Sequence, residues 1–367
     1  MHTKEIAKMR KGIPIGLIIT VMTITACGGA GTVSSDDYVT YEVGTVDSTE
    51  ENEDMQPDNT NGRVVSENTL GVEDAAPVVY FTSDISAEGL VKIYEQLGWN
   101  PEGKIAVKIS TGEPPASNYL RPELIGELVQ KLDGTIVECN TAYGGSRSSS
   151  AVHHQVAEDH GFTAIADFDL MDEFGEMNIP VTVPEGMEQH LTEDVVGNHF
   201  ADYDYFLILS HFKGHAMAGY GGAIKNISIG IASPTGKALI HSGGKSSTNI
   251  WGGNQTDFTE SMAEAGKAVS DYLGNGERII YINVMNRLSV DCDCDGNPAE
   301  PDIHDIGILA SSDPVALDQA CIDLVYQAEG NASLVKRIES RNGIHTLEHA
   351  EEIGLGSRTY NLVSIDE

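Results

Sequence analysis

The chain has 367 residues, and its 56 acidic and 22 basic side chains give a formal net charge of -34 at pH 7. Binding to nucleic acid needs a basic surface, so this charge argues against nucleic acid as a partner. Apolar residues make up 40% of the chain, which is enough for a sizeable hydrophobic core.

The start of the chain has the pattern of an export signal. The apolar residues 13–24 are too few to span a bilayer comfortably, and they follow four basic side chains, Lys4, Lys8, Arg10 and Lys11. The segment ends in Ile-Thr-Ala-Cys, which resembles a bacterial lipobox. We expect residues 1–26 to be a lipoprotein signal peptide and Cys27 to carry the lipid. The folded part would then be exported and anchored on the outer face of the cell membrane; an uncleaved anchor or an ordinary signal peptide is the alternative.

Residues 27–75 have a different composition from the rest of the chain. They are rich in Asp, Glu, Ser, Thr and Asn and poor in aliphatic side chains. Such a segment buries too little apolar surface to offset the entropy lost on ordering. We therefore predict an acidic, disordered tether, extended by its own negative charge.

Residues 76–367 predict an α/β domain with a mainly parallel sheet covered by helices, as a single large domain or two closely joined lobes. The expected strands are 78–81, 105–110, 135–139, 205–210, 278–284 and 306–310. The expected helices are 87–97, 122–132, 257–273 and 314–326, the last with Asp313 as its N-cap. In this class of fold, ligands bind at the carboxyl ends of the strands.

Nitrogen-bearing side chains gather directly after the expected strand 205–210. Residues 211–226 read HFKGHAMAGYGGAIKN, which includes four candidates for ligand binding or acid–base chemistry, His211, Lys213, His215 and Lys225. The residues that would let the backbone approach a ligand, or contact it, are Gly214, Gly221, Gly222 and Asn226. Turn-forming glycines and solvated side chains are the alternative interpretation.

Other polar residues follow neighbouring expected strands. Lys108 and Arg121 flank the Thr-Gly-Glu-Pro-Pro segment and are candidates to bind an anionic substrate. Asn140, Tyr143 and Arg147 follow the strand that ends at 139 and would border the same crevice.

A second stretch, DCDCDGNPAEPDIHD, carries metal-ligand chemistry. Cys292 and Cys294 would lie on one side of an extended segment, because alternate residues of a strand share a face. Asp302 and Asp305 add carboxylates, and His304 lies between them. Thiolate, imidazole and carboxylate together suit Zn, Fe or a similar cation. A disulfide between the two cysteines, or from either to Cys139 or Cys321, and inert thiols are the alternatives.

The stretches HFKGHAMAGYGGAIKNISIGIASPTGK and DCDCDGNPAEPDIHDIGILASSDPVALDQACIDLV resemble the domain-of-unknown-function 362 family, whose members are often described as iron–sulfur proteins. Some relatives carry a ferredoxin-like insertion with Cys-x-x-Cys spacing, whereas residues 240–253 here contain no cysteine. The resemblance therefore implies a metal or iron–sulfur site without assuring an ordinary ferredoxin cluster.

Two functional classes follow from these motifs. The first is an enzyme for a small anionic substrate, or a redox protein, in which both motifs face one crevice and Lys213 and Lys225 are drawn to Asp302, Asp305 or a bound anion. The second is a lipoprotein that binds a metal or small ligand without turnover. The cofactor would be Fe, Zn or an iron–sulfur cluster.

Overall fold

The computed structural model describes residues 62–64 and 76–366, which belong to one compact unit. The expected signal peptide, the lipidation site Cys27 and all of the expected tether except Gly62–Val64 lie outside the described residues. Gly62–Val64 forms a short strand, β1, that pairs in parallel with a strand near the C-terminus. Among the described helices, none combines the length and apolarity that crossing a membrane requires.

The described residues form a nine-stranded sheet, in the order β1-β13-β2-β12-β11-β8-β3-β4-β5. All neighbouring pairs run parallel except the two that involve β12. The expected mainly parallel α/β fold is thus confirmed. The strands after β1 are β2 (Val78–Thr82), β3 (Ile105–Lys108), β4 (Thr135–Glu138), β5 (Phe168–Leu170), β8 (Tyr205–His211), β11 (Ile279–Met285), β12 (Gly307–Ser311) and β13 (Tyr360–Ser364).

Strand β12 departs from the simple alternation of strands and crossover helices. No described helix lies between β11 and β12, so the chain returns through a loop and the two strands pair antiparallel. Only parallel neighbours need a crossover connection. The segment that contains both cysteines of the second motif is this returning loop.

The helices begin where the sequence supplies caps. Ser86 accepts a hydrogen bond from Gly89 N at the start of α1, and Asp313 accepts from Val315 N and Ala316 N at the start of α7, as its predicted N-cap role requires. The helices are α1 (Ala87–Gln96), α2 (Pro122–Lys131), α3 (Ser150–Asp159), α4 (Ala223–Ile227), α5 (Pro234–Ser242), α6 (Gln255–Tyr272), α7 (Pro314–Gln327), α8 (Ala332–Ser340) and α9 (Gly343–Glu352).

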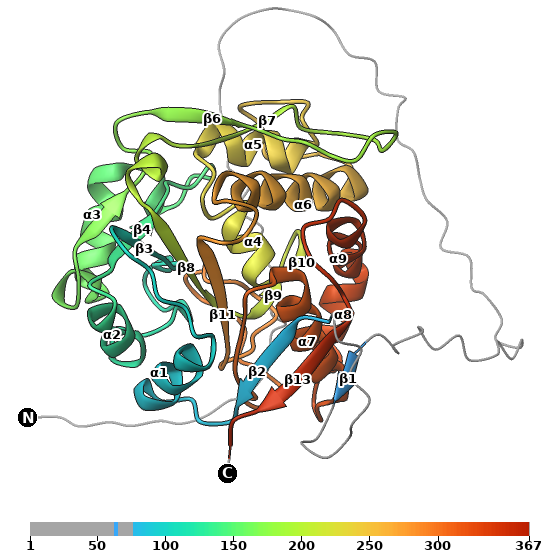
Figure 1. The fold of residues 1–367 in the computed structure, drawn as a ribbon. Helices are drawn as coiled ribbons and strands as arrows, with labels where there is room; N and C mark the ends of the chain where they lie inside the picture. The colour runs from blue at the N-terminus through green and yellow to red at the C-terminus, as the bar shows by residue number, and fades with distance from the viewer. Residues whose placement is uncertain (1–61, 65–75, 367) are drawn as a thin grey trace, which may run out of the picture. The chain divides into compact units, whose positions relative to one another are not determined.

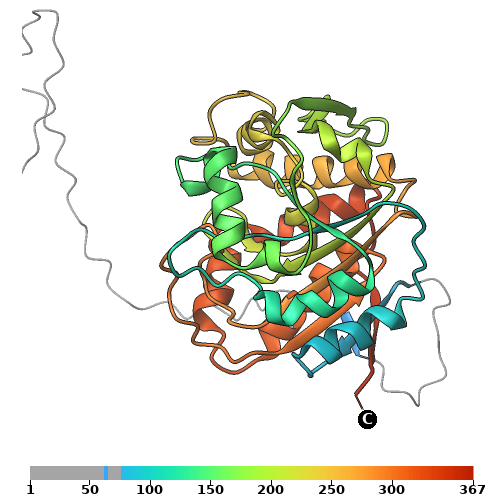
Figure 2. The ribbon, with the colours of Figure 1, turned by 90° about the vertical axis from the view of Figure 1, so that its left-hand side faces the viewer.

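Side chains alternate between the two faces of the sheet along each strand, and a hydrophobic core covers each face. In β8, Leu207 and Leu209 pack in the core with α1 and α2, whereas Phe206 and Ile208 belong to the core that includes α4, α6 and α7. Strand β13, near the C-terminus of the chain, lies beside β2 (Figure 2).

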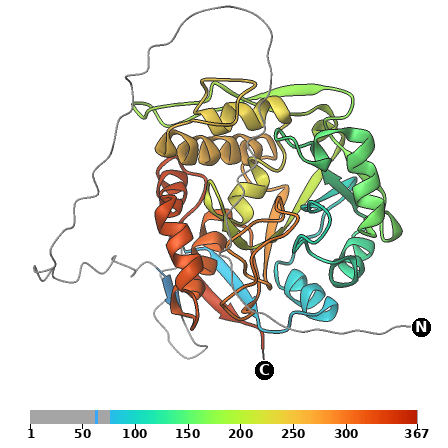
Figure 3. The same ribbon diagram turned by 180° about the vertical axis from the view of Figure 1, so that it is seen from behind.

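Two hairpins complete the fold. The hairpin of β6 (Glu176–Pro180) and β7 (Glu193–Gly197) lies beside α5 and α6 (Figure 1). The smaller hairpin of β9 (Lys213–His215) and β10 (Gly219–Gly221) contacts α8. Figure 3 shows that α9 lies beside α6.

Candidate functional site

A cavity of about 590 Å³ opens at the carboxyl ends of the central strands. The last residues of β3, β4 and β8, which are Lys108, Glu138 and His211, all line it. This is the position expected for a ligand site in an open α/β sheet.

The cavity forms where the two motif segments meet. Gly214 N donates a hydrogen bond to Ser289 O at 2.8 Å. A Cβ atom at Gly214 would lie 2.3 Å from the carbonyl oxygen of Val290, so only glycine permits this approach. On the other side of the returning loop, Glu113 N donates to Asp293 O at 2.7 Å. The cysteine loop is therefore held between the β9–β10 hairpin and the segment after β3.

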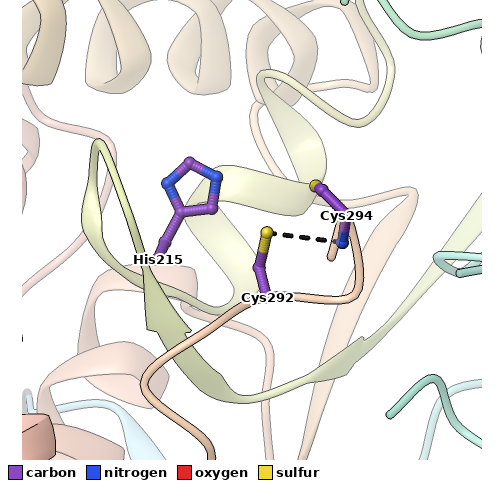
Figure 4. A group of neighbouring side chains, drawn as sticks. All are labelled: His215, Cys292 and Cys294. Atoms are coloured by element: carbon purple, nitrogen blue, oxygen red, sulfur yellow. Dashed lines mark hydrogen bonds between the residues drawn. The ribbon is translucent and has the colours of Figure 1, made fainter. Parts of the chain in front are cut away.

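His215, Cys292 and Cys294 converge on the cavity. One potential ligand atom from each residue lies within 4.8 Å of the others. Figure 4 shows a ring nitrogen of His215 facing the two cysteines, while Cys294 N donates to the Cys292 sulfur at 3.3 Å. His215 and Cys292 are buried and Cys294 is half-buried. These three residues, hereafter the His–Cys–Cys group, could hold a metal ion.

The backbone determines how the imidazole of His215 is oriented. Its Nδ1 accepts hydrogen bonds from Met217 N at 3.2 Å and Ala218 N at 3.0 Å. Burial, followed by the charge of Lys225, lowers the pKa of His215 to about 4, so the ring is neutral at pH 7. A neutral ring whose Nδ1 accepts carries its proton on Nε2. For the neutral ring to bind a metal through Nε2, the proton would have to move to Nδ1 and these two amide hydrogen bonds would have to be given up.

The two thiols have different environments. A hydrogen bond from Cys292 is the largest influence that lowers the pKa of the Cys294 thiol, and His215 and Lys225 add to it against the effect of burial. The same hydrogen bond and burial raise the pKa of Cys292. All four cysteines among the described residues are unpaired, and the other two, Cys139 and Cys321, are buried.

Asp293, between the two cysteines, connects the two motifs. Its carboxylate contacts His211 Nδ1 at 2.8 Å and Lys213 Nζ at 2.9 Å, and its side chain is 1% exposed. Burial alone would raise the pKa of Asp293, but the charges of Lys213 and His211 hold it well below the ordinary range. Lys213 therefore pairs with Asp293, and the expectation that Asp302 or Asp305 would attract it was wrong.

His211 has no ring nitrogen free for a ligand. Its Nδ1 contacts Asp293, and its Nε2 donates to the carbonyl of Asn286 at 2.6 Å. His211 thus holds the returning loop against the end of β8, whereas we had expected acid–base or ligand chemistry from it.

A buried polar network forms the floor of the cavity. Lys108 Nζ donates to Glu138 at 2.8 Å and to the Asn226 side chain at 3.1 Å. Arg147 contacts both Glu138 and Glu113 at 3.3 Å. Burial raises the pKa of Glu138, but the charges of Lys108 and Arg147 outweigh it and lower that pKa to about 2. Lys108 and Arg147 are therefore neutralised by carboxylates of the protein.

Helix α4 carries Lys225 to the cavity. Asp318 accepts hydrogen bonds from Ala223 N and Ile224 N at its first turn, and a Cβ at Gly222 would lie 2.3 Å from this carboxylate. A Cβ at Gly221 would make only ordinary van der Waals contacts, at 3.4 Å from Lys225 and 3.7 Å from Lys213. Gly222 thus makes room for a contact within the protein, and both glycines line the cavity.

Two cavity residues on α5 were not identified in the sequence. Lys237 is 6% exposed and donates to the carbonyl of Ala232. His241 is 8% exposed, and its Nδ1 donates to the carbonyl of Lys237 at 2.7 Å. Burial lowers the pKa of His241 to about 3, so the ring is neutral and its Nε2 carries a free lone pair.

Five residues expected at the site do not line the cavity: Gly214, Arg121, Asn140, Asp302 and Asp305. Arg121 lies over the Tyr119 ring, 3.8 Å from its centroid. Asp302 accepts a hydrogen bond from Ser333 at 2.5 Å, and Asp305 accepts from Arg287 N at 2.6 Å. Both residues are exposed, and their carboxylates form these bonds at the surface, outside the His–Cys–Cys group.

Comparison with known families identifies the domain. The family described as "Domain of unknown function (DUF362)" matches residues 105–323, which is more than half of the chain. The chain belongs to the DUF362 family. The match includes every residue of the His–Cys–Cys group, the Asp293 pairs and helices α4 and α5. A search of curated proteins found no match.

Two solved structures resemble this DUF362 chain distantly. The lactate racemase apoprotein from Thermoanaerobacterium thermosaccharolyticum is 14% identical, with a TM-score of 0.37, covering 70% of this chain and 58% of that chain. A protein from Thermotoga maritima is 13% identical, with a TM-score of 0.38, covering 73% of this chain and 58% of that chain. The chain spans less than two thirds of either protein, and a likeness at this level carries no argument about activity.

Proposed function

We propose that this DUF362 protein is an exported, lipid-anchored enzyme whose cavity binds Zn²⁺ or Fe²⁺ and an anionic small molecule beside it. The observation that carries the proposal is the His–Cys–Cys group, whose ligand atoms lie within 4.8 Å of one another on the wall of the cavity. Export and the lipid on Cys27 are supported by the sequence of the first 27 residues.

The donor set favours a single borderline-soft cation. Two thiolates and one imidazole match the ligands that Zn²⁺ and Fe²⁺ accept in proteins. An ordinary [4Fe–4S] cluster takes four thiolates, and the group among the described residues offers only two. A metal with three protein ligands keeps a position open for water or substrate and acts there as a Lewis acid.

The residues around the metal site suit binding and proton transfer. Lys225 lines the cavity, and its ammonium group makes no hydrogen bond or ion pair within the described part of the chain, so it is available to an anion. The neutral His241 ring lines the same cavity, and its Nε2 can accept a hydrogen bond from a ligand there. The Lys225 ammonium and this acceptor suit the binding of an organic substrate beside the metal, which is why we propose an enzyme and not a protein that only stores metal.

Metal content tests the proposal. Full-length protein, purified in detergent without air, should contain about one equivalent of Zn or Fe by elemental analysis. The variant Cys292→Ser/Cys294→Ser should lose it, because hydroxyls replace thiolates poorly as soft ligands. Cys139→Ala/Cys321→Ala is the matched control, since these buried cysteines lie outside the group and should leave the metal in place. Wild-type protein without metal after reconstitution, or a serine variant that keeps a full equivalent, would overturn the proposal.

A further inference from the structure

The cavity is much larger than a metal ion and a two- or three-carbon anion require. Its volume of about 590 Å³ lies within the range of about 300–1,000 Å³ that is typical of sites for drug-sized ligands. The bound molecule can therefore have a sizeable body as well as an anionic group.

The cationic groups of the cavity fall into two sets. Lys108, Arg147 and Lys213 each form an ion pair with a buried carboxylate of the protein. Lys225 and Lys237 have no carboxylate within 4.0 Å in the described residues. Two ammonium groups in the cavity thus make no ion pair with a carboxylate of the described residues, although the chain as a whole has a net charge of -34.

The burial of Lys237 makes the lack of a contacting carboxylate significant, since Asp172 and Asp194 interact with its charge only from beyond ion-pair distance. An ammonium group can donate three hydrogen bonds, and only the one to the carbonyl of Ala232 is present. Buried charges in proteins are ordinarily paired, because removing them from water is costly. Lys225 lies on α4 and Lys237 on α5, so two separate elements direct unpaired charge to one cavity.

Part of the cavity lining is apolar. Ile229 and Ile250 are buried residues of the wall, and Met217 lines it as well. Trp251 also lines the cavity but is 64% exposed, which is unusual for so large an apolar side chain. It lies in the loop between α5 and α6, next to Gly252 at φ +81°. An aromatic ring at the rim can cover the apolar part of a ligand.

We propose that the cavity binds an amphipathic organic anion, with its acidic group held by Lys225 and Lys237 and its hydrocarbon body packed against Ile250 and Trp251. This inference deepens the proposed function and rests on it for the neighbouring metal. It names the substrate class as an acid with an alkyl or aromatic body, in place of an anion as small as acetate.

Decanoate and acetate are suitable probes because they share a carboxylate and differ in the apolar body. The chain contains two tryptophans, so Trp99→Phe leaves Trp251 as the only one. Addition of decanoate to the full-length Trp99→Phe protein should shift Trp251 emission to shorter wavelength, and calorimetry should give an affinity at least ten-fold above that for acetate.

Lysine variants test which charges hold the acid. Lys225→Met/Lys237→Met should weaken decanoate binding at least ten-fold. Lys245→Met is the matched control, since Lys245 pairs with Asp257 outside the cavity and should leave the affinity unchanged. Equal affinity for decanoate and acetate, no binding of either, or an unchanged affinity in the double lysine variant would each overturn the inference. Metal content, measured in the same samples, separates this failure from a failure of the proposed function.

Discussion

Replacement of Asp293 by Asn tests how the two motif segments are held together. The amide has nearly the same shape but cannot pair with both His211 and Lys213, which contact opposite oxygens at 2.8 and 2.9 Å. Removing one partner of a buried ion pair costs about 3–5 kcal/mol. The Lys213 side chain is 11% exposed and gains some solvation, so we expect the lower end of that range, about 3 kcal/mol.

The pH dependence of this loss follows from the depressed pKa of Asp293. A carboxylate with a lowered folded-state pKa stabilises the protein above its unfolded pKa of about 3.9, and this contribution is lost as the pH falls through the folded pKa. The part of the difference between wild type and Asp293→Asn that comes from the ionisation of the carboxylate should therefore be the same at pH 7 and at pH 5. At pH 3 it should be smaller by about 1 kcal/mol, because one pKa unit corresponds to about 1.4 kcal/mol.

Urea unfolding of the full-length protein, monitored by circular dichroism, gives the free energies of unfolding. Asp295→Asn is the matched control, because Asp295 lies in the same loop, is exposed and bonds only to a neighbouring amide. Its effect should stay within about 0.5 kcal/mol. A similarly small effect of Asp293→Asn at pH 7 would refute the role of the buried pairs, and so would a difference that grows as the pH falls from 5 to 3.

Three further outcomes are expected. Gly222→Ala should lower the free energy of unfolding by at least about 1 kcal/mol, because the new Cβ would lie 2.3 Å from the Asp318 carboxylate. An unchanged free energy in urea unfolding would mean that α4 shifts to make room. Cys27→Ser should release the protein from membranes or leave its leader uncleaved, as judged by fractionation and mass spectrometry; unchanged association and processing would contradict lipidation. Metal affinity should fall as the pH falls from 8 to 6, because the thiols must lose protons to bind. Titration with a competing chelator measures this affinity, and a value that does not change with pH would contradict thiolate ligation.

The sheet was predictable from the sequence because short apolar runs bounded by turns are a strong signal for buried strands. Strand β8 was expected at 205–210 and forms at Tyr205–His211, and its parallel pairing with β11 places both motif segments at one edge. The antiparallel direction of β12 was harder to predict from the sequence, because the loop before it contains no pattern that excludes a short crossover helix.

The site was harder to predict because it depends on distances between segments far apart in the chain. Gly214 and Gly222 were interpreted as room for a ligand, but they make room for Val290 and Asp318. Asp293 is one of 56 acidic residues, and nothing local distinguishes its buried carboxylate from the exposed ones. Lys237 and His241 did leave a signal, because Ser233 and Pro234 begin a helix on which residues four apart share a face.

X-ray absorption spectroscopy of the metal-loaded protein tests the central claim most directly. Zn²⁺ bound by Cys292, Cys294 and His215 should give two sulfur neighbours at about 2.3 Å and one nitrogen neighbour at about 2.0 Å, with the remaining position held by a light atom. The sulfur shell should disappear in Cys292→Ser/Cys294→Ser. A first shell made only of oxygen and nitrogen in the wild-type protein would contradict a metal centre at these cysteines.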